Sequence, residues 1–244
     1  MHRIQFKNLY HKMKYLKLYE QFRLVTENEE SLPGVDIPEN KIQNYQSKPI
    51  ILIGPQGTGK STTSKALAEK LGIPLVSTDM SMVDKKYEDA CKDEPGVKVE
   101  IKRHPTEGLA EGEVYYDSND EYVFCVLKKL IEEYGDKKIV LDVGGTHAYV
   151  SERLSPEVIK IFEKSPNLFI FNVSNDENET YEFLKKRREG RGEKTEGEDD
   201  KKFRNAIDSL NNYYSDTQKI SIIKEDKSEK TTEEIVDEII SKLQ

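Results

Sequence analysis

The sequence has few cysteines and no long apolar run, and each absence excludes a class of protein. It contains no run of about 18 or more apolar residues, so a transmembrane helix is not predicted. The N-terminus lacks the apolar core followed by small residues that a secretory signal needs. The two cysteines, Cys91 and Cys125, match no metal-ligand spacing, and we interpret them as ordinary thiols. These features predict a cytoplasmic protein in a reducing compartment.

An excess of positive charge is also missing. Lys and Arg number 38 against 46 Asp and Glu, which gives a formal net charge of -8. Such a field repels nucleic acid, although a local basic patch is compatible with it, so we do not expect a nucleic-acid partner. The hydrophobic content of 35% in 244 residues is enough for one sizeable core. The expected organisation is one domain with an extension.

The extension is residues 1–47. Apolar residues in its first half recur mostly every three or four positions, and basic residues lie between them. This pattern is typical of a basic amphipathic helix, which either packs on the main domain or binds a membrane surface or a protein partner through residues 1–24. Polar residues, prolines and a glycine over 26–48 indicate a linker. The main domain is predicted to cover 48–244.

In the main domain, short apolar segments alternate with helical patterns, which predicts an α/β fold of three layers with a parallel sheet. Residues 84–117 have no clear pattern, and 189–200, with three glycines and many charges, are interpreted as a mobile loop. The predicted strands are 50–53, 73–76, 138–141, 168–173 and 220–223. The predicted helices are 61–71, 118–135 after a capping box at Ser118-x-x-Glu121, one from 155, 179–189, 201–214 and one after the capping box Thr231-x-x-Glu234.

The segment Gly54 to Ser61 is the most specific feature of the chain. Its residues GPQGTGKS fit the P-loop pattern G-x-x-x-x-G-K-[ST], with a predicted strand before it and a helix after it. Glycines let backbone N–H groups surround a phosphate, and the helix adds its positive end. Lys60 is expected to reach the β- and γ-phosphates of ATP, and Ser61 to ligate Mg²⁺. A dinucleotide site fits poorly because the G-x-G-x-x-G spacing is absent.

Two carboxylates and a basic segment are further candidates. Asp142 follows a predicted strand, where an aspartate approaches the Mg²⁺ of P-loop proteins; its structural alternative is a turn cap. Asp79 follows the second strand and can take a proton from an acceptor hydroxyl, help hold the metal, or simply form a turn. Arginines on a closing lid stabilise a transferring phosphoryl group, unless they form a solvated face. The lid candidates are Arg187, Arg188 and Arg191.

The full set of predicted nucleotide-binding residues extends from the loop to the lid. It comprises Gly54, Gln56, Gly57, Thr58, Gly59, Lys60, Ser61, Thr62 and Arg187. Weaker candidates are Arg103 and His104 for an anionic substrate, and His147 for the acceptor; a single histidine is more often a surface or hydrogen-bonded residue.

Residues 48–244 resemble the shikimate-kinase-like branch of the nucleoside-monophosphate-kinase fold. The resemblance implies a sheet order of 2-3-1-4-5, ATP at the P-loop, a lid that closes over it, and phosphate transfer to a small-molecule hydroxyl. Shikimate itself is not expected, because its binding members carry Asp-x-Asp where this chain reads Ser77-Thr78-Asp79, and substrate arginines that are absent here. The matching segments are ILIGPQGTGKST at 51–62, LAEKLGIPLVSTD at 67–79, VLDVGGT at 140–146, the lid near 187–191 and the terminal segment 211–240.

Three functions remain open at this point. The first is an ATP-dependent phosphotransferase with a small-molecule or nucleotide acceptor, in which positioning and electrostatics supply nearly all the catalysis. Its catalytic residues would be Lys60, Asp79, Asp142, Arg188 and Arg191, with Mg²⁺ held by Ser61 and Asp142. The second is a polynucleotide 5′-hydroxyl kinase. The third is a non-catalytic ATP-binding module that docks a partner through its N-terminal helix.

Overall fold

A computed structural model describes most of the chain from Lys48 onward. The helix and linker predicted in residues 1–47 lie outside the described part, so the domain boundary at residue 48 stays a prediction. The described residues are 48–103, 114–145, 147, 155–163, 165–174, 176–190, 192, 197–214 and 217–243.

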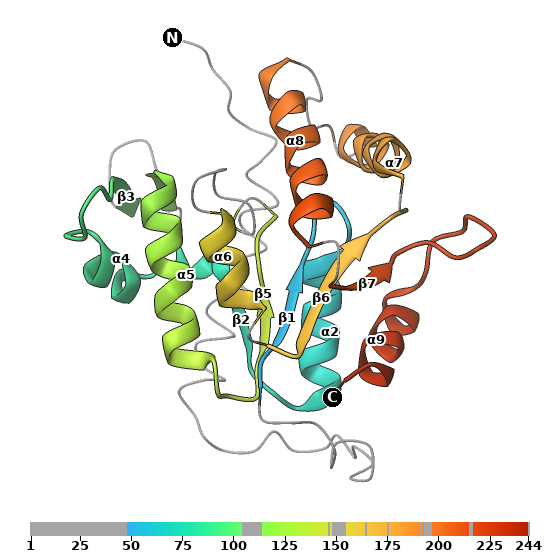
Figure 1. Cartoon of the computed structure of the whole chain (residues 1–244), viewed down its shortest axis with the longest axis horizontal. Helices are drawn as coiled ribbons and strands as arrows, with labels where there is room; N and C mark the ends of the chain where they lie inside the picture. Colours follow the sequence, from blue (N-terminus) through green and yellow to red (C-terminus); the bar gives the residue numbers. More distant parts are fainter. Residues whose placement is uncertain are drawn as a thin grey trace.

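A parallel sheet of five strands forms the centre of the fold, in the order β2-β5-β1-β6-β7 (Figure 1). The middle strand β1 (Ile50–Ile53) pairs with β5 (Val140–Asp142) on one side and with β6 (Asn167–Asn172) on the other. β2 (Leu75–Ser77) and β7 (Gln218–Ser221) form the two edges. The three inner strands are buried throughout, which explains their apolar sequences. The predicted α/β class and the strand order 2-3-1-4-5 are confirmed.

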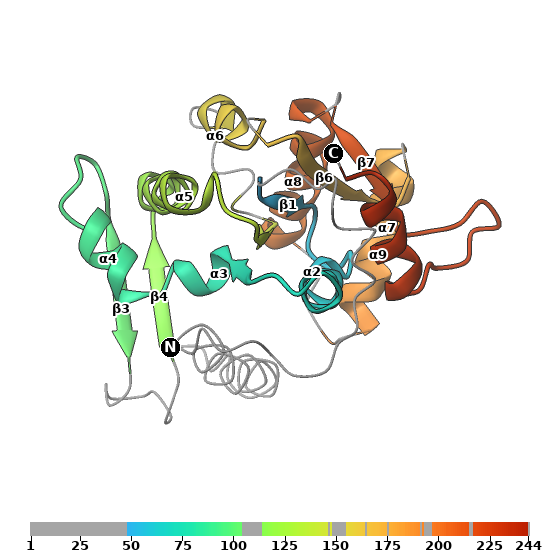
Figure 2. The ribbon, with the colours of Figure 1, turned by 90° about the horizontal axis from the view of Figure 1, so that it is seen from below.

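Helices cover both faces of the sheet (Figure 2). On one face, α5 (Asp120–Tyr134) and α6 (Ser155–Phe162) pack against the side chains that β1, β5 and β6 direct to that face. On the other face, α2 (Lys60–Leu71) and α9 (Thr232–Ser241) pack against the alternate side chains of the same strands. Because a strand alternates its side chains between two faces, one apolar run supplies both cores.

Two further helices, α7 (Glu177–Gly190) and α8 (Glu198–Tyr213), pack against each other (Figure 1). Tyr181 of α7 and Phe203 of α8 have ring centroids 6.2 Å apart. The loop predicted at 189–200 is shorter in the structure, since α7 continues to Gly190 and α8 begins at Glu198.

Capping boxes were predicted at the starts of two helices, and the structure confirms one of them. Thr231 and Glu234 form the capping box at the start of α9, as predicted. The capping box predicted at Ser118 is wrong, because Ser118 is the last residue of a strand. Asn119 caps α5 instead, and its side chain accepts a hydrogen bond from the backbone N–H of Tyr122.

Residues 78–118 form a small unit on the β2 side of the sheet. It contains two short helices, α3 (Thr78–Ser81) and α4 (Lys85–Cys91), and an antiparallel pair, β3 (Val99–Arg103) with β4 (Val114–Ser118). The sequence of 84–117 did not predict these elements because each is short. Residues 104–113, between β3 and β4, lie outside the described part.

A disulfide joins this unit to the main core. Cys91 of α4 and Cys125 of α5 are bonded, with Cα atoms 5.9 Å apart. The prediction of two ordinary thiols is therefore wrong: the residues are distant in sequence, but α4 packs directly on α5. The cysteines consequently no longer indicate a reducing compartment. None of the helices in the described ranges has the length and apolar character that a membrane span needs.

Breaking this disulfide should destabilise the domain. The bond joins cysteines that are 34 residues apart in the sequence. Closing a loop of this size adds about 3–4 kcal/mol to the free energy of unfolding, because it restricts the unfolded chain. We expect a lower urea midpoint for the wild type in dithiothreitol than without it, with the thiol content checked by alkylation and intact mass. A Cys91→Ala/Cys125→Ala variant should show the same midpoint in both buffers. Free thiols in the non-reduced native protein would contradict the pairing.

Candidate functional site

The loop between β1 and α2 is fixed by its glycines and by one internal contact. Gly59, the residue before α2, has φ of +83°, a conformation that favours glycine, and supplies no side-chain cap to the helix. The hydroxyl of Thr58 donates to the carbonyl of Pro55 at 3.0 Å and is buried. The first N–H groups of α2 are thus left open at a helix N-terminus, which is the arrangement that binds anions.

A buried ion pair lies beside this loop. The Nζ atom of Lys60, the first residue of α2, is 3.2 Å from Oδ1 of Asp142, the last residue of β5. The two side chains are only 8% and 6% exposed. The pairing of β5 with β1 places Asp142 opposite Leu52, two residues before the loop begins. The sequence predicted both residues, and the structure brings them together.

Asp79 lies just beyond the end of the neighbouring strand β2, in a cluster with a buried histidine. Register places Ser77 of β2 beside Asp142, and Asp79 follows in the first turn of α3. The Asp79 side chain is 67% exposed, whereas His147 behind it is 6% exposed. The Nδ1 atom of His147 is 3.4 Å from Oδ1 of Asp79 and 2.8 Å from Oγ1 of Thr78.

The environment of His147 favours its neutral form. Burial lowers the pKa of the imidazole, the Asp79 carboxylate raises it, and the nearby Lys60 ammonium lowers it again. Its Nε2 atom is 3.4 Å from the hydroxyl of Tyr116, which stands on β4. The sequence suggested His147 only as a weak candidate that faces the acceptor. The available signal was its position after the glycine pair.

Gly144 makes this cluster close-packed. Its N–H donates to Oγ1 of Thr78 at 2.8 Å. A Cβ atom at this position would lie 2.3 Å from Oδ1 of Asp79 and 2.7 Å from Nδ1 of His147. Only a residue without a side chain therefore fits between the loop after β5 and the start of α3.

The lid candidates are only partly in the described structure. Arg187 of α7 donates to the carbonyl of Gly57 in the P-loop at 2.7 Å and pairs with Glu229. Arg188 is buried, and its guanidinium lies 4.4 Å from the centroid of the Phe203 ring. Arg191 lies outside the described residues. Arg187 is thus next to the P-loop, while Arg188 packs between α7 and α8.

Most of the remaining candidates also lie in the described part of the chain, and one does not. Ser61 is partly exposed in the first turn of α2, and Gln56 and Thr62 are exposed. Arg103 pairs with Glu88 at 2.7 Å and donates to the carbonyl of Val83, so it stabilises the unit around α4. His104 lies outside the described part.

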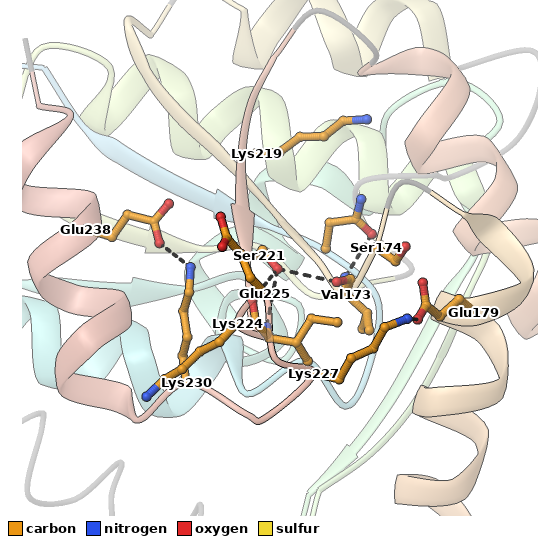
Figure 3. A pocket seen from close by; sticks show the side chains of 12 residues that line it. Val173, Ser174, Glu179, Lys219, Ser221, Lys224, Glu225, Lys227, Lys230 and Glu238 are labelled. Carbon is orange, nitrogen blue, oxygen red and sulfur yellow. Dashed lines mark hydrogen bonds and ion pairs between the residues drawn. The ribbon is translucent and has the colours of Figure 1, made fainter.

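A cavity lies elsewhere, around the ends of β6 and β7 (Figure 3). It measures about 750 Å³. Several of its charged side chains form ion pairs, for example Lys227 with Glu179 at 2.5 Å and Lys230 with Glu238 at 2.7 Å. No P-loop residue lines it, so the candidate site is the region around Lys60. The lining residues are Asn172, Val173, Ser174, Glu179, Lys219, Ser221, Ile223, Lys224, Glu225, Lys227, Lys230 and Glu238.

Comparison with known proteins gives a match over the P-loop region and a similar fold. The family model of the ATPases associated with various cellular activities (AAA) matches residues 50–107, which include the P-loop. A solved shikimate kinase from Acinetobacter baumannii, in complex with shikimate, aligns over 84% of this chain and 96% of its own, with a TM-score of 0.52 and 16% identity. The chain has the P-loop kinase fold of the shikimate-kinase group.

Curated proteins match parts of the chain. Shikimate kinase from Dehalococcoides mccartyi is 34% identical over 97 residues, which are 39% of this chain and 43% of that protein. A tRNA dimethylallyltransferase from Mycoplasmoides gallisepticum is 29% identical over 127 residues, which are 51% of this chain and 40% of that protein. The chain therefore spans less than half the length of either relative.

Adding a methyl group at Gly144 should disturb the Asp79 cluster. Because the new Cβ would overlap Asp79 and His147, we expect Gly144→Ala to lower the free energy of unfolding by about 1–3 kcal/mol. Gly190→Ala is the matched control, since nothing lies within 4 Å of its Cβ position, and it should stay within about 0.5 kcal/mol of the wild type. Urea denaturation measures both. Equal stability of the two variants would contradict the close packing.

Proposed function

We propose that this protein is an ATP-dependent phosphotransferase that acts on the hydroxyl of a small molecule or on a nucleotide. The observation that carries the proposal is the buried pair of Lys60 and Asp142 beside an open helix N-terminus, with the exposed Asp79 carboxylate at the start of α3, just after the adjacent strand β2. The P-loop kinase fold supports the same reading.

The donor side would be formed by the P-loop. The amides from Gly54 to Gly59 and the N-terminus of α2 would hold the phosphates, and the Lys60 ammonium would neutralise the β- and γ-phosphates. Mg²⁺ binds proteins through one or two oxygen ligands and keeps its other positions for water and phosphate. The Ser61 hydroxyl and the Asp142 carboxylate fit that donor set, and the metal, when bound, would neutralise charge on the phosphates.

The acceptor side would be formed around Asp79. Its exposed carboxylate would accept the proton of the acceptor hydroxyl while that oxygen forms a bond with the γ-phosphorus, and ADP would leave. Arg187, already bonded to a P-loop carbonyl, is placed to contact a phosphate, and Arg188 and Arg191 stay lid proposals. The arrangement works by positioning and charge rather than by covalent chemistry.

Replacing Lys60 tests the donor side. Lys60→Met removes the ammonium and leaves a buried carboxylate unpaired, so we expect turnover to fall by on the order of 10² or more. Lys65→Ala, one turn later on the same helix and 44% exposed, is the matched control. Calorimetry of ATP binding and the initial rate of ADP release measure the two effects. Full turnover in Lys60→Met would contradict the assignment of the site.

The acceptor would be sought by a parallel screen of ADP release. Sugars, nucleosides, nucleotides, hydroxy acids and oligonucleotides are offered with Mg²⁺-ATP. Stimulation by a small molecule supports the proposal. Salt-sensitive stimulation by an oligonucleotide indicates a polynucleotide kinase instead. Tight ATP binding without any stimulated release indicates a nucleotide-binding module.

Transfer of a dimethylallyl group is a second candidate. The match to a tRNA dimethylallyltransferase over half of this chain favours it. A P-loop recognises a phosphate chain, so a donor with a diphosphate leaving group also fits the loop. In that reaction the acceptor bonds to carbon and diphosphate leaves, whereas a kinase releases ADP. Phosphorus NMR of the products separates the two reactions.

A further inference from the structure

His147 is a buried polar side chain that the proposed reaction does not use. It is 6% exposed, and it contacts three residues on two elements: Thr78 and Asp79 at the start of α3, and Tyr116 on β4. A neutral imidazole has one donor and one acceptor nitrogen, so a buried histidine takes a polar partner at each of them. Here both ring nitrogens face polar groups, and one of those groups is the exposed carboxylate of Asp79.

The charge of Asp79 favours one of the two positions for the proton on the His147 ring. Two acceptors repel each other, so a neutral imidazole next to a carboxylate places its proton on Nδ1. In that tautomer Nδ1–H would donate to Oγ1 of Thr78 at 2.8 Å, with Oδ1 of Asp79 3.4 Å from the same nitrogen. Nε2 accepts from the hydroxyl of Tyr116, which burial keeps protonated by raising its pKa.

The backbone closes the other side of the cluster. Gly144 donates its N–H to Thr78, and its own α-carbon lies so close that a Cβ would overlap both Asp79 and His147. The Asp79 carboxylate is therefore bounded by the imidazole and by this glycine, and it is open only towards solvent. Charged groups from the other elements that influence His147 are Lys60 of α2 and Asp142 of β5.

We propose that His147 is a positioning residue, which holds the Asp79 carboxylate in the orientation that faces the acceptor hydroxyl. The inference rests on the proposed phosphotransferase function, because Asp79 is the proton acceptor in that reaction. His147 acts through Asp79 and does not itself touch the acceptor. The residues involved are Tyr116, whose hydroxyl is hydrogen-bonded to His147, and Asp79, whose Oδ1 lies 3.4 Å from Nδ1 of the same imidazole.

The contact is tested first without any turnover. Nitrogen-15 NMR of the intact chain reports which imidazole nitrogen carries the proton, and the signal lost in His147→Asn identifies this histidine among the four. We expect a neutral ring with the proton on Nδ1, and a shift of that nitrogen when Asp79→Asn removes the carboxylate charge. A proton on Nε2 that is indifferent to Asp79→Asn overturns the proposal, whatever reaction the protein catalyses.

Turnover is then measured with Mg²⁺-ATP as the donor and water as the acceptor. His147→Leu should lower kcat by about tenfold or more, with ATP affinity within about threefold of the wild type. His147→Asn, which keeps a polar group near Nδ1, should recover most of the rate. Because His147 acts through Asp79, adding His147→Leu to Asp79→Asn should cost nothing further.

Each outcome of the turnover measurement separates the two hypotheses. An additive loss in the double variant, or equal loss in His147→Asn and His147→Leu, overturns the positioning role. A wild type that binds ATP but releases no ADP, either with water or with any acceptor of the screen, counts against the phosphotransferase function, and the NMR result then decides the His147 contact by itself. Thermal unfolding of each variant shows that the compared proteins are folded.

Discussion

The pair of opposite charges at Lys60 and Asp142 is the constraint on which the site depends. Removing either charge from water costs several kcal/mol, and the attraction between them offsets this only while both are present and well aligned. Their 3.2 Å separation follows from the pairing of β1 with β5. Lys60 comes after β1 and the P-loop, and Asp142 is the last residue of β5. A slip of one residue in that pairing would turn Asp142 to the other face of the sheet.

The two sides of the site are held by different means. The donor side is a backbone structure, a glycine loop between a buried strand and a helix. The acceptor side is a small unit fixed to α5 by the Cys91–Cys125 bond and by the hydroxyl of Tyr122, which donates to the carbonyl of Met82 at 2.8 Å. Arg187 connects α7 to the P-loop. The contacts therefore tie the 78–118 unit to α5, and α7 to the P-loop.

The sequence predicted what depends on local pattern and on position along the sheet. Buried apolar runs located the strands, and the P-loop motif located Lys60 and its partner strand. Asp79 and Asp142 were found because the ends of neighbouring parallel strands meet at one edge. The disulfide and the contacts of His147 were not predictable in this way, because each joins residues whose distance is set by packing between α3, α4, β4 and α5. Short elements in 84–117 carry too few residues for a periodic signal.

The division between a backbone donor side and a side-chain acceptor side bears on the kind of reaction. Inward amides and one ammonium group recognise a phosphate chain without regard to what it carries, so they fit ATP and a diphosphate donor equally. Chemistry is then selected by the groups that meet the acceptor. In the proposed reaction those groups would be an exposed carboxylate and, behind it, a buried imidazole whose pKa is lowered by burial. A carboxylate held this way suits removal of a proton from a hydroxyl or an amine, so the nature of the leaving group, rather than the P-loop, distinguishes the candidate reactions.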